Sequence, residues 1–236
     1  MTRAPTNSTR AALCLALVCA AFGSFTSATV ARAAGAASLL ARAEKNTNSV
    51  STLIHTDFNV ITTPTLIVQV HARGAEDEAR NRERDVESVV VTARSGGKTK
   101  HTLRYSAEII FMNGTVYYRT SYHAQKWISA RGTRFVDPYT GGWQRARTMV
   151  TFPATAHFQP VGTSGGTSEF RASSFAAQGG TETASLWVSG GATPYVVREV
   201  VDYRASRGGG EEHQDTRLGP FNTRILILAP TKGGTT

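Results

Sequence analysis

The sequence predicts a mainly β (α+β) fold, in which a strongly curved antiparallel sheet packs against one long N-terminal helix. Apolar and polar residues alternate along most of the chain after residue 50, which is the period of a strand with one buried face. Turn sequences rich in Gly, Asn and Pro separate these runs. Helical spacing of apolar residues is convincing only over Ala36–Val50. We expect about ten strands, most of them joined as hairpins.

The N-terminal segment 1–33 has the layout of a secretory signal peptide. Arg3 and Arg10 give it a positive start, a short apolar run follows, and small residues lead to an Ala-Arg-Ala site that ends at Ala33. The apolar run is shorter than the about 20 residues of a membrane-spanning helix, although an uncleaved anchor is the alternative. We therefore expect cleavage after Ala33, a secreted or periplasmic location, and one mature domain over residues 34–236.

Both cysteines of the chain, Cys14 and Cys19, lie within this segment. Cleavage after Ala33 leaves no cysteine, which excludes disulfide bonds, thiolate metal sites and a cysteine nucleophile. Lipidation at Cys19 is the alternative, but the branched Val18 before it is poorly suited to such a cut. Removal of the segment's three arginines lowers the net charge from +9 to +6. This charge favours transient contact with anionic membranes or, on the other interpretation, only keeps the protein soluble.

The first two strands are predicted from matched alternation on the two sides of Thr62-Thr63-Pro64. A hairpin centred near Thr63 would pair Phe58 with Val68, Val60 with Leu66, and His55 with His71. One face of this hairpin would be apolar and would lie on the concave side of the sheet, toward the helix. Its members are Phe58, Val60, Leu66, Val68 and Val70.

The remaining strands are read from the same alternation and from turn chemistry. The mixed charges of residues 73–87 predict a solvated loop or a short exposed helix. Asn113-Gly114 is the strongest hairpin signal, since both residues accept a positive φ. A short helix is expected within residues 148–158. The expected strands are residues 86–94, 99–112, 116–121, 169–175, 183–188, 194–204, 214–218 and 224–228, the last two closing the sheet.

Three patterns that suggest chemistry do not develop into sites. His157 and Ser164 lie seven residues apart in one loop without a nucleophile elbow, so they do not indicate a serine protease. His55 and His71, with Asp57 nearby, would form half a metal site, but no third ligand is evident. The glycine pairs fall at hairpin turns, not in a phosphate-binding loop. The sequence therefore predicts no enzyme activity, no metal, no cofactor and no nucleic-acid partner.

Apolar and aromatic residues distributed over several strands are the candidate ligand-binding residues. A curved sheet of about ten strands presents more apolar surface than one helix covers, and the excess would line a cavity for an apolar ligand. The alternative is that these side chains only pack the core beneath the helix. The candidates are Phe58, Val60, Leu66, Val68, Val70, Tyr105, Phe111, Tyr118, Trp127 and Trp187.

Two hairpin motifs and a closing strand resemble those of the LolA/LppX-like carriers of lipids and lipoproteins. They are Phe111–Arg119 around Asn-Gly, Leu186–Val197 with its Leu-Trp-Val, turn and Pro, and the closing segment Phe221–Pro230. The similarity runs loosely over residues 36–230. It implies an open, unclosed β-barrel wrapped around helices, with a hydrophobic cavity for acyl chains. The chain lacks the convincing lipobox of the lipid-anchored members.

The resemblance thus implies an exported, non-catalytic carrier whose partner is a lipid or an acylated lipoprotein. A fold does not by itself determine a function, and the same group includes sensor domains of envelope-stress regulators. The alternative is therefore an envelope sensing or protein-interaction module that uses the same cavity.

Overall fold

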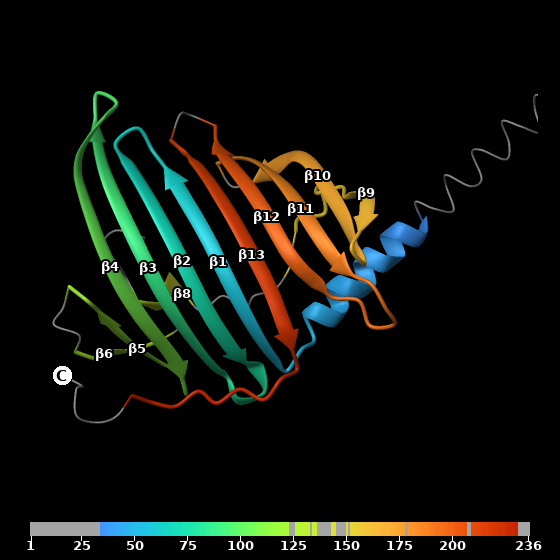
Figure 1. The fold of residues 1–236 in the computed structure, drawn as a ribbon, viewed down its shortest axis with the longest axis horizontal. Coiled ribbons are helices and arrows are strands. Elements are labelled where there is room, and N and C mark those ends of the chain that lie inside the picture. Colours follow the sequence, from blue (N-terminus) through green and yellow to red (C-terminus); the bar gives the residue numbers. More distant parts are fainter. Residues whose placement is uncertain are drawn as a thin grey trace, which may run out of the picture. The chain divides into compact units, whose positions relative to one another are not determined.

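An antiparallel sheet of eleven strands dominates the computed structural model (Figure 1). The structure describes residues 34–122, 126–132, 134–135, 143–144, 150, 152–177, 179–206 and 209–230. The expected signal segment, its cut after Ala33 and both cysteines lie outside the described residues. The chain divides into two units, residues 1–39 and residues 40–236, and the sheet belongs to the second.

The strand order of the sheet is β6-β5-β4-β3-β2-β1-β13-β12-β11-β10-β9. Two meanders therefore meet where the first strand, β1, pairs with the last, β13. The two end strands, β6 and β9, have one neighbour each, so the barrel is not closed, and the predicted fold class is confirmed. The strands are β1 (Thr52–Thr62), β2 (Leu66–Asp77), β3 (Arg82–Ser95), β4 (Lys98–Met112), β5 (Thr115–Thr120), β6 (Ile128–Arg131), β9 (Gln159–Ser164), β10 (Thr167–Ala177), β11 (Gly180–Ser189), β12 (Val196–Ala205) and β13 (Glu211–Phe221). A separate pair is formed by β7 (Arg134–Phe135) and β8 (Trp143–Gln144).

The predicted helix exists and spans residues 34–47, of which residues 40–47 belong to the unit that holds the sheet. In that unit Leu40, Ala43 and Thr47 are buried, at helical spacing. The Thr47 hydroxyl donates to the Ala43 carbonyl oxygen at 2.8 Å and accepts the Val196 amide at 2.9 Å. Asn46 Nδ2 donates to the Pro194 carbonyl oxygen at 2.8 Å. These bonds attach the end of the helix to the start of β12.

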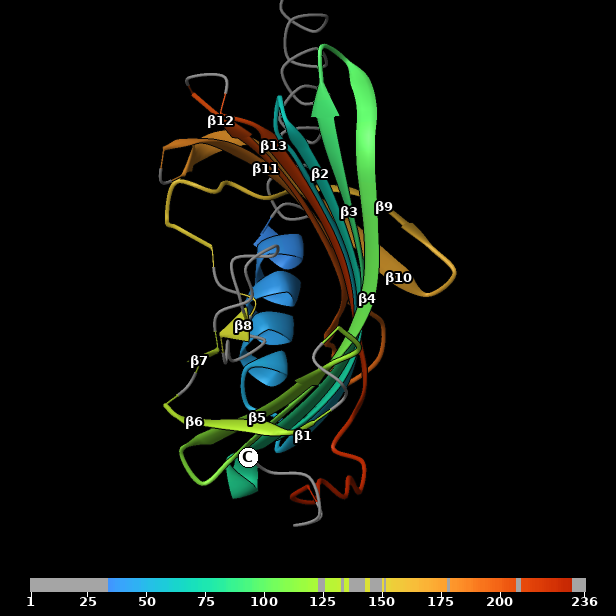
Figure 2. The ribbon, with the colours of Figure 1, turned by 90° about the vertical axis from the view of Figure 1, so that its left-hand side faces the viewer.

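The concave face of the sheet can be followed across it by register. Phe170 and Leu186 are buried at one end of the row, and Phe152 and Phe158 cover the neighbouring Ala172 and Ala184. Figure 2 shows the sheet curving toward this side. The successive partners are Phe170, Leu186, Glu199, Thr216, Asp57, Ala72, Glu87, Ala107 and Thr120. The adjacent row faces the other way, onto the convex side: Trp187, Arg198, Arg217, Thr56, Arg73, Val86, Glu108 and Arg119.

The predicted register of the first hairpin is wrong. Phe58 pairs with His71, Val60 with Gln69, and His55 with Gly74. The connection is wider than expected, since Thr63 N donates to the Leu66 carbonyl oxygen and Leu66 N donates back to Thr63 Oγ1. Each of these β1 residues pairs with a β2 residue three positions further along the chain than predicted. A shift by an odd number of residues exchanges the two faces of a strand. Leu66, Val68 and Val70 lie on the concave side as predicted, but Phe58 and Val60 lie on the convex side.

Three further predictions of secondary structure are corrected. Residues 73–87 are not a loop: β2 and β3 run through them and turn at the short 3-10 helix Glu78–Arg80. Residues 152–158 contain no helix, and their aromatic side chains pack on β10 and β11. Residues 224–228 are not a strand, because they run extended along the sheet without a ladder and bury Ile227 against Ile110 and Met112.

The hairpin predicted at Asn113-Gly114 is confirmed. Both residues have positive φ, 52° and 71°, as a tight turn between β4 and β5 requires. The hairpin expected around Ser189-Gly190-Gly191 is also present, as β11 and β12. In the described part of the chain, no helix has the length and apolar character needed to cross a bilayer.

Candidate ligand-binding face

Register divides the ten predicted ligand-binding residues between the two faces of the sheet. Six share the concave face: Leu66, Val68, Val70, Tyr105, Phe111 and Tyr118. The other four lie on the convex side: Phe58, Val60, Trp127 and Trp187. There Phe58 packs against His71 at 4.5 Å between ring centroids, and the guanidinium groups of Arg119 and Arg198 cover the two tryptophans. These four side chains therefore do not contribute to a concave site.

The six concave candidates belong to two apolar clusters. The β2–β4 cluster consists of Val68, Val89, Val91 and Tyr105, with Ile61, Leu66, Val70, Leu103 and Tyr122 packed against it. The ring of Tyr122 meets that of Tyr105 edge-on at 4.9 Å. The β4–β5 cluster consists of Ala107, Ile109, Phe111 and Val116, with Tyr118 packed against it.

The core members of both clusters are buried, at 0–6% exposed, although they lie too far across the sheet for residues 40–47 to cover. The helix is attached at Pro194 and Val196, at the start of β12, while the β2–β4 cluster is centred on β3, four strand spacings away. Four spacings amount to about 19 Å along the sheet, whereas a helix with its side chains is about 10 Å wide. The concave face is therefore wider than the part of the helix that packs on it.

An ionisable cluster lies between the apolar clusters and the helix. His55 Nε2 is 3.0 Å from Asp85 Oδ1, and its Nδ1 is 3.6 Å from Asp57 Oδ2 and 3.7 Å from Glu76 Oε1. His55 and Asp85 come from β1 and β3 and meet across β2. They meet because Gly74 stands between them: a Cβ there would overlap both His55 Nε2 and Asp85 Oδ1.

The cluster shifts the pKa values of its members. Burial would lower the pKa of His55, but the hydrogen bond to Asp85 and the surrounding carboxylates outweigh burial and raise it to about 9. Burial raises the pKa of Glu199 to about 7, and the charges of Asp57 and Glu182 add to this effect. The middle of the concave face is therefore polar and acidic, whereas the sequence predicted an apolar face throughout.

Sequence reasoning misses this cluster because the mixed charges of residues 73–87 predict a solvated loop or a short exposed helix. A signal was present: Glu83, Asp85 and Glu87 alternate with Arg84 and Val86 at the period of a strand. Of these acids, Glu83 and Asp85 are buried. Alternating acids on a strand indicate a polar face only if the segment is first recognised as a strand.

The structure also places the residues of the patterns that suggested chemistry. His55 and His71 lie on opposite faces and do not form a pair. The extended strand β9 separates His157 from Ser164 by about 20 Å. Among the residues that the structure describes, no group of three or more His, Cys, Asp and Glu side chains could hold a metal ion.

The convex face carries arginines, in contrast to the acidic middle of the concave face. Its ion pairs join arginines to acids on neighbouring strands, and Arg198 and Asp215 pair at 2.8 Å.

A surface groove of about 430 Å³ lies at the ends of β1, β13, β12 and β11. Most residues that line it are of polar or charged types, and the lining includes Val60, Thr183, Asp202, Arg204, Glu211 and His213. Among these, only Val60 was predicted to line a ligand site.

No protein-family model matches the sequence, and no curated protein is detectably similar to it. Among solved structures, LprF from Mycobacterium bovis shows 14% identity and a TM-score of 0.45, over 82% of this chain and 95% of that one. The Mycobacterium tuberculosis lipoprotein LppX shows 8% identity and a TM-score of 0.46, over 80% of this chain and 96% of that one. The fold of the chain resembles the folds of LprF and LppX.

Proposed function

We propose that the protein is an exported, non-catalytic carrier that holds the acyl chain of a lipid or of an acylated lipoprotein against the concave face of its open barrel. The observation that carries this proposal is the width of that face. Two apolar clusters lie on it beyond the reach of residues 40–47. Secretion through the segment 1–33, with a mature domain over residues 34–236, places the carrier outside the cytoplasm.

The energetics are compatible with useful affinity. Burial of a methylene group is worth about 0.8 kcal/mol, so a sixteen-carbon tail is worth about 12 kcal/mol before costs. If a third of this is lost to ordering and desolvation, about 8 kcal/mol remains, which corresponds to a micromolar dissociation constant. Affinity should therefore rise with chain length from C12 to C18.

The acyl chain is expected to contact the concave candidates alone. Leu66, Val68 and Val70 would flank it on β2, and Tyr105, Phe111 and Tyr118 on β4 and β5. The polar cluster around His55 would lie at its side and restrict where the tail can run. The proposed site does not include the four candidates on the convex side, which are Phe58, Val60, Trp127 and Trp187.

A matched pair of valines tests this proposal. Val70 and Val60 are both half-buried on neighbouring strands, but they lie on opposite faces of the sheet. Val70→Asp should weaken binding of a fluorescent fatty acid by more than about tenfold, because it places a charge beside the tail. Val60→Asp should bind as the native protein does. Equal loss in both variants, or no binding of any C12–C18 amphiphile and no co-purified lipid, would remove the carrier function.

The second candidate is a sensing or protein-interaction module. The polar middle of the concave face favours it, because Asp57 and Glu199 would suit a peptide backbone better than an acyl chain. Native mass spectrometry of gently purified protein separates the two. A bound lipid supports the carrier, while lipid-free protein that retains a bound polypeptide supports the module.

A further inference from the structure

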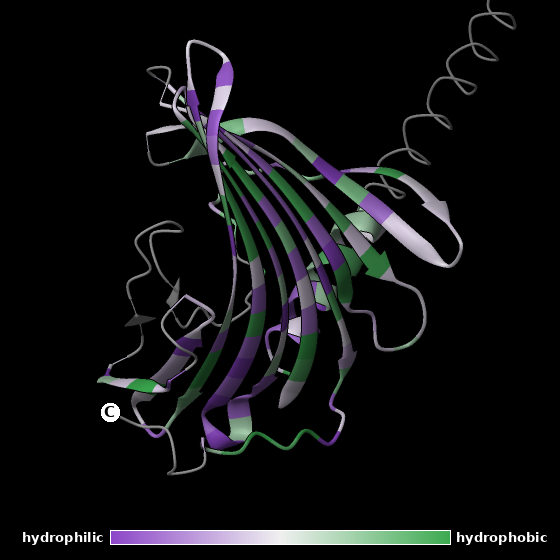
Figure 3. Ribbon diagram, turned by 60° about the vertical axis from the view of Figure 1, so that its left-hand side comes forward, coloured by the Kyte–Doolittle hydropathy of each residue, from purple (hydrophilic) through white to green (hydrophobic). Residues whose placement is uncertain are grey.

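The C-terminal strap, residues 223–230, has one buried and one exposed apolar side. Ile225 and Ile227 face the sheet and pack against Ile110, Met112 and Trp127. The intervening Leu226 and the following Leu228 are 75% and 62% exposed, the highest values among the large hydrophobic residues that the structure describes. Figure 3 shows the strap as a mostly green ribbon along the end of the sheet. Two leucines are thus presented together, about 7 Å apart on an extended chain.

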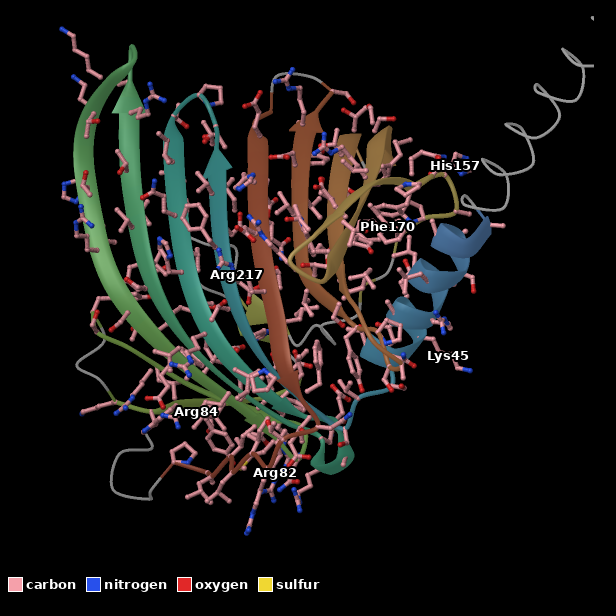
Figure 4. All side chains as sticks on the ribbon, turned by 45° about the vertical axis from the view of Figure 1, so that its right-hand side comes forward. Lys45, Arg82, Arg84, His157, Phe170 and Arg217 are labelled. Atoms are coloured by element: carbon pink, nitrogen blue, oxygen red, sulfur yellow. The ribbon has the colours of Figure 1, made fainter. Side chains whose placement is uncertain are left out.

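Basic side chains lie at the same end of the sheet as these leucines. Arg82 lies against the strap, since its Nη1 donates to the Ile227 carbonyl oxygen at 3.1 Å. Arg84 pairs in register with Ile110, beneath Ile227, and Figure 4 labels it with Arg82 at the end of the sheet along which the strap runs. Arg80, two residues before Arg82, and Arg224, within the strap itself, are both exposed.

The acids at this end are less exposed than the arginines that they pair with. The side chain of Asp77 is 2% exposed and that of its partner Arg80 is 64% exposed. Glu108 and its partner Arg84 are 12% and 50% exposed. Glu78, the remaining acid of the turn between β2 and β3, is half-buried. The exposed surface at this end of the sheet therefore presents guanidinium groups and two leucines.

We propose that this end of the protein docks on an anionic phospholipid surface. Leu226 and Leu228 enter the boundary between head groups and acyl chains, and the arginines contact phosphate groups. The proposal rests on the proposed carrier function and deepens it, because it names the surface at which a lipid would be taken up or released. Two leucines and a few arginines give weak, reversible attachment, as a carrier requires.

Vesicle binding tests the proposal directly. The mature protein should co-sediment with phosphatidylcholine vesicles that contain phosphatidylglycerol, bind pure phosphatidylcholine more weakly, and detach as salt is raised. The double variant Leu226→Ser/Leu228→Ser should bind about tenfold more weakly. Arg224→Gln should weaken binding and reduce its salt dependence. Val161→Ser is the matched control, because it removes an exposed apolar residue on β9 and should change nothing.

The competing outcomes are distinguishable. If the native protein ignores anionic vesicles, or if the double leucine variant binds them as well as the native protein does, the docking proposal is overturned. If the native protein is a dimer and the leucine variant is a monomer, without a change in vesicle binding, the strap joins two copies of the chain. The docking proposal is then also overturned. Titration with a soluble fatty acid tests the carrier function separately. The affinity for the fatty acid should be the same in the native protein and in the double leucine variant.

Discussion

Gly74 determines whether the ionisable cluster can exist. Its missing side chain leaves the space through which the His55 ring reaches Asp85 from two strands away. Its backbone lies in an ordinary strand, so the requirement comes from the close approach of neighbours and not from its φ. At this scale the structure depends on the absence of one carbon atom.

Gly74→Ala should therefore destabilise the protein strongly. The new Cβ overlaps His55 and Asp85, so the pair must separate while both groups remain buried, and we expect a loss of about 2–4 kcal/mol. Urea unfolding measures the loss. Gly162→Ala is the control, because a Cβ there meets nothing within 4 Å. Similar stability of the two variants would contradict the packing described for Gly74.

The raised pKa of Glu199 predicts how stability depends on pH. Its pKa rises from 4.5 to about 7 on folding, so the folded state binds this proton more tightly than the unfolded state does. Stability due to this group is therefore complete below pH 4.5 and falls as the pH rises to about 7. The raised pKa of His55 acts in a higher window, from 6.5 to about 9, and also lowers stability as the pH rises.

Glu199→Gln should remove the loss of stability between pH 4.5 and 7. We expect a melting temperature several degrees above that of the native protein at pH 8 and close to it at pH 4.5. Thermal unfolding at a series of pH values checks this. The exposed Glu211 provides the control variant Glu211→Gln, which should follow the native curve. A native-like pH profile for Glu199→Gln would show that the carboxyl group ionises freely in the folded state.

The C-terminal strap is held in place without a strand ladder. Its described contacts include the packing of Ile225 and Ile227 and two hydrogen bonds to its carbonyl oxygens, from Thr52 Oγ1 to Thr223 at 2.7 Å and from Arg82 Nη1 to Ile227 at 3.1 Å. It covers the convex side of β4, where Ile110 and Met112 would otherwise be exposed to water. The alternation that suggested a strand in the sequence therefore reports one buried side, which an extended segment acquires without joining a sheet.

Two neighbouring strap residues should respond very differently to truncation. Ile227 is 2% exposed, and Ile227→Ala should cost about 2–4 kcal/mol of unfolding free energy because it leaves a cavity against Ile110. Leu228, which is 62% exposed, should tolerate Leu228→Ala with a change within about 0.5 kcal/mol. Denaturant unfolding of the two variants compares them. A larger loss for Leu228→Ala than for Ile227→Ala would mean that Leu228, and not Ile227, faces the sheet.

At the scale of the whole sheet, charge is divided between two faces. Carboxylates of β1, β2, β3 and β12 face the concave side, while the convex side carries arginines paired with acids on neighbouring strands. The two edges of the unclosed barrel are short strands, and Pro160 lies on β9, where it provides no amide proton. These features keep an open sheet from pairing with further copies of itself.

Export of the whole molecule is tested at its N-terminus. The Ala-Arg-Ala site predicts that the secreted protein begins at Ala34, followed by Gly35 and Ala36. N-terminal sequencing of protein recovered from the medium or the periplasm measures this. A mature protein that begins at a diacylated Cys19 would instead be anchored to a membrane by its lipid.

Local chemistry determined where this chain forms strands and turns. Alternation located most of the strands, and Asn113-Gly114 predicted a turn because few other residues adopt the positive φ of both positions. The apolar spacing over Ala36–Val50 predicted the helix to within a few residues of its observed bounds, 34–47. Each of these predictions depends on the conformation of neighbours in the sequence.

The tertiary structure decided which face of each strand points inward. The first strand carries apolar residues on both faces, such as Leu53 and Ile61 on one and Phe58 and Val60 on the other, so its alternation could not select the concave side. The connection after Thr62 made that choice, and burial of Glu83 and Asp85 followed from partners on other strands. Register is a relation between distant segments, and a shift of one residue reverses every side chain, so composition and period alone do not contain it.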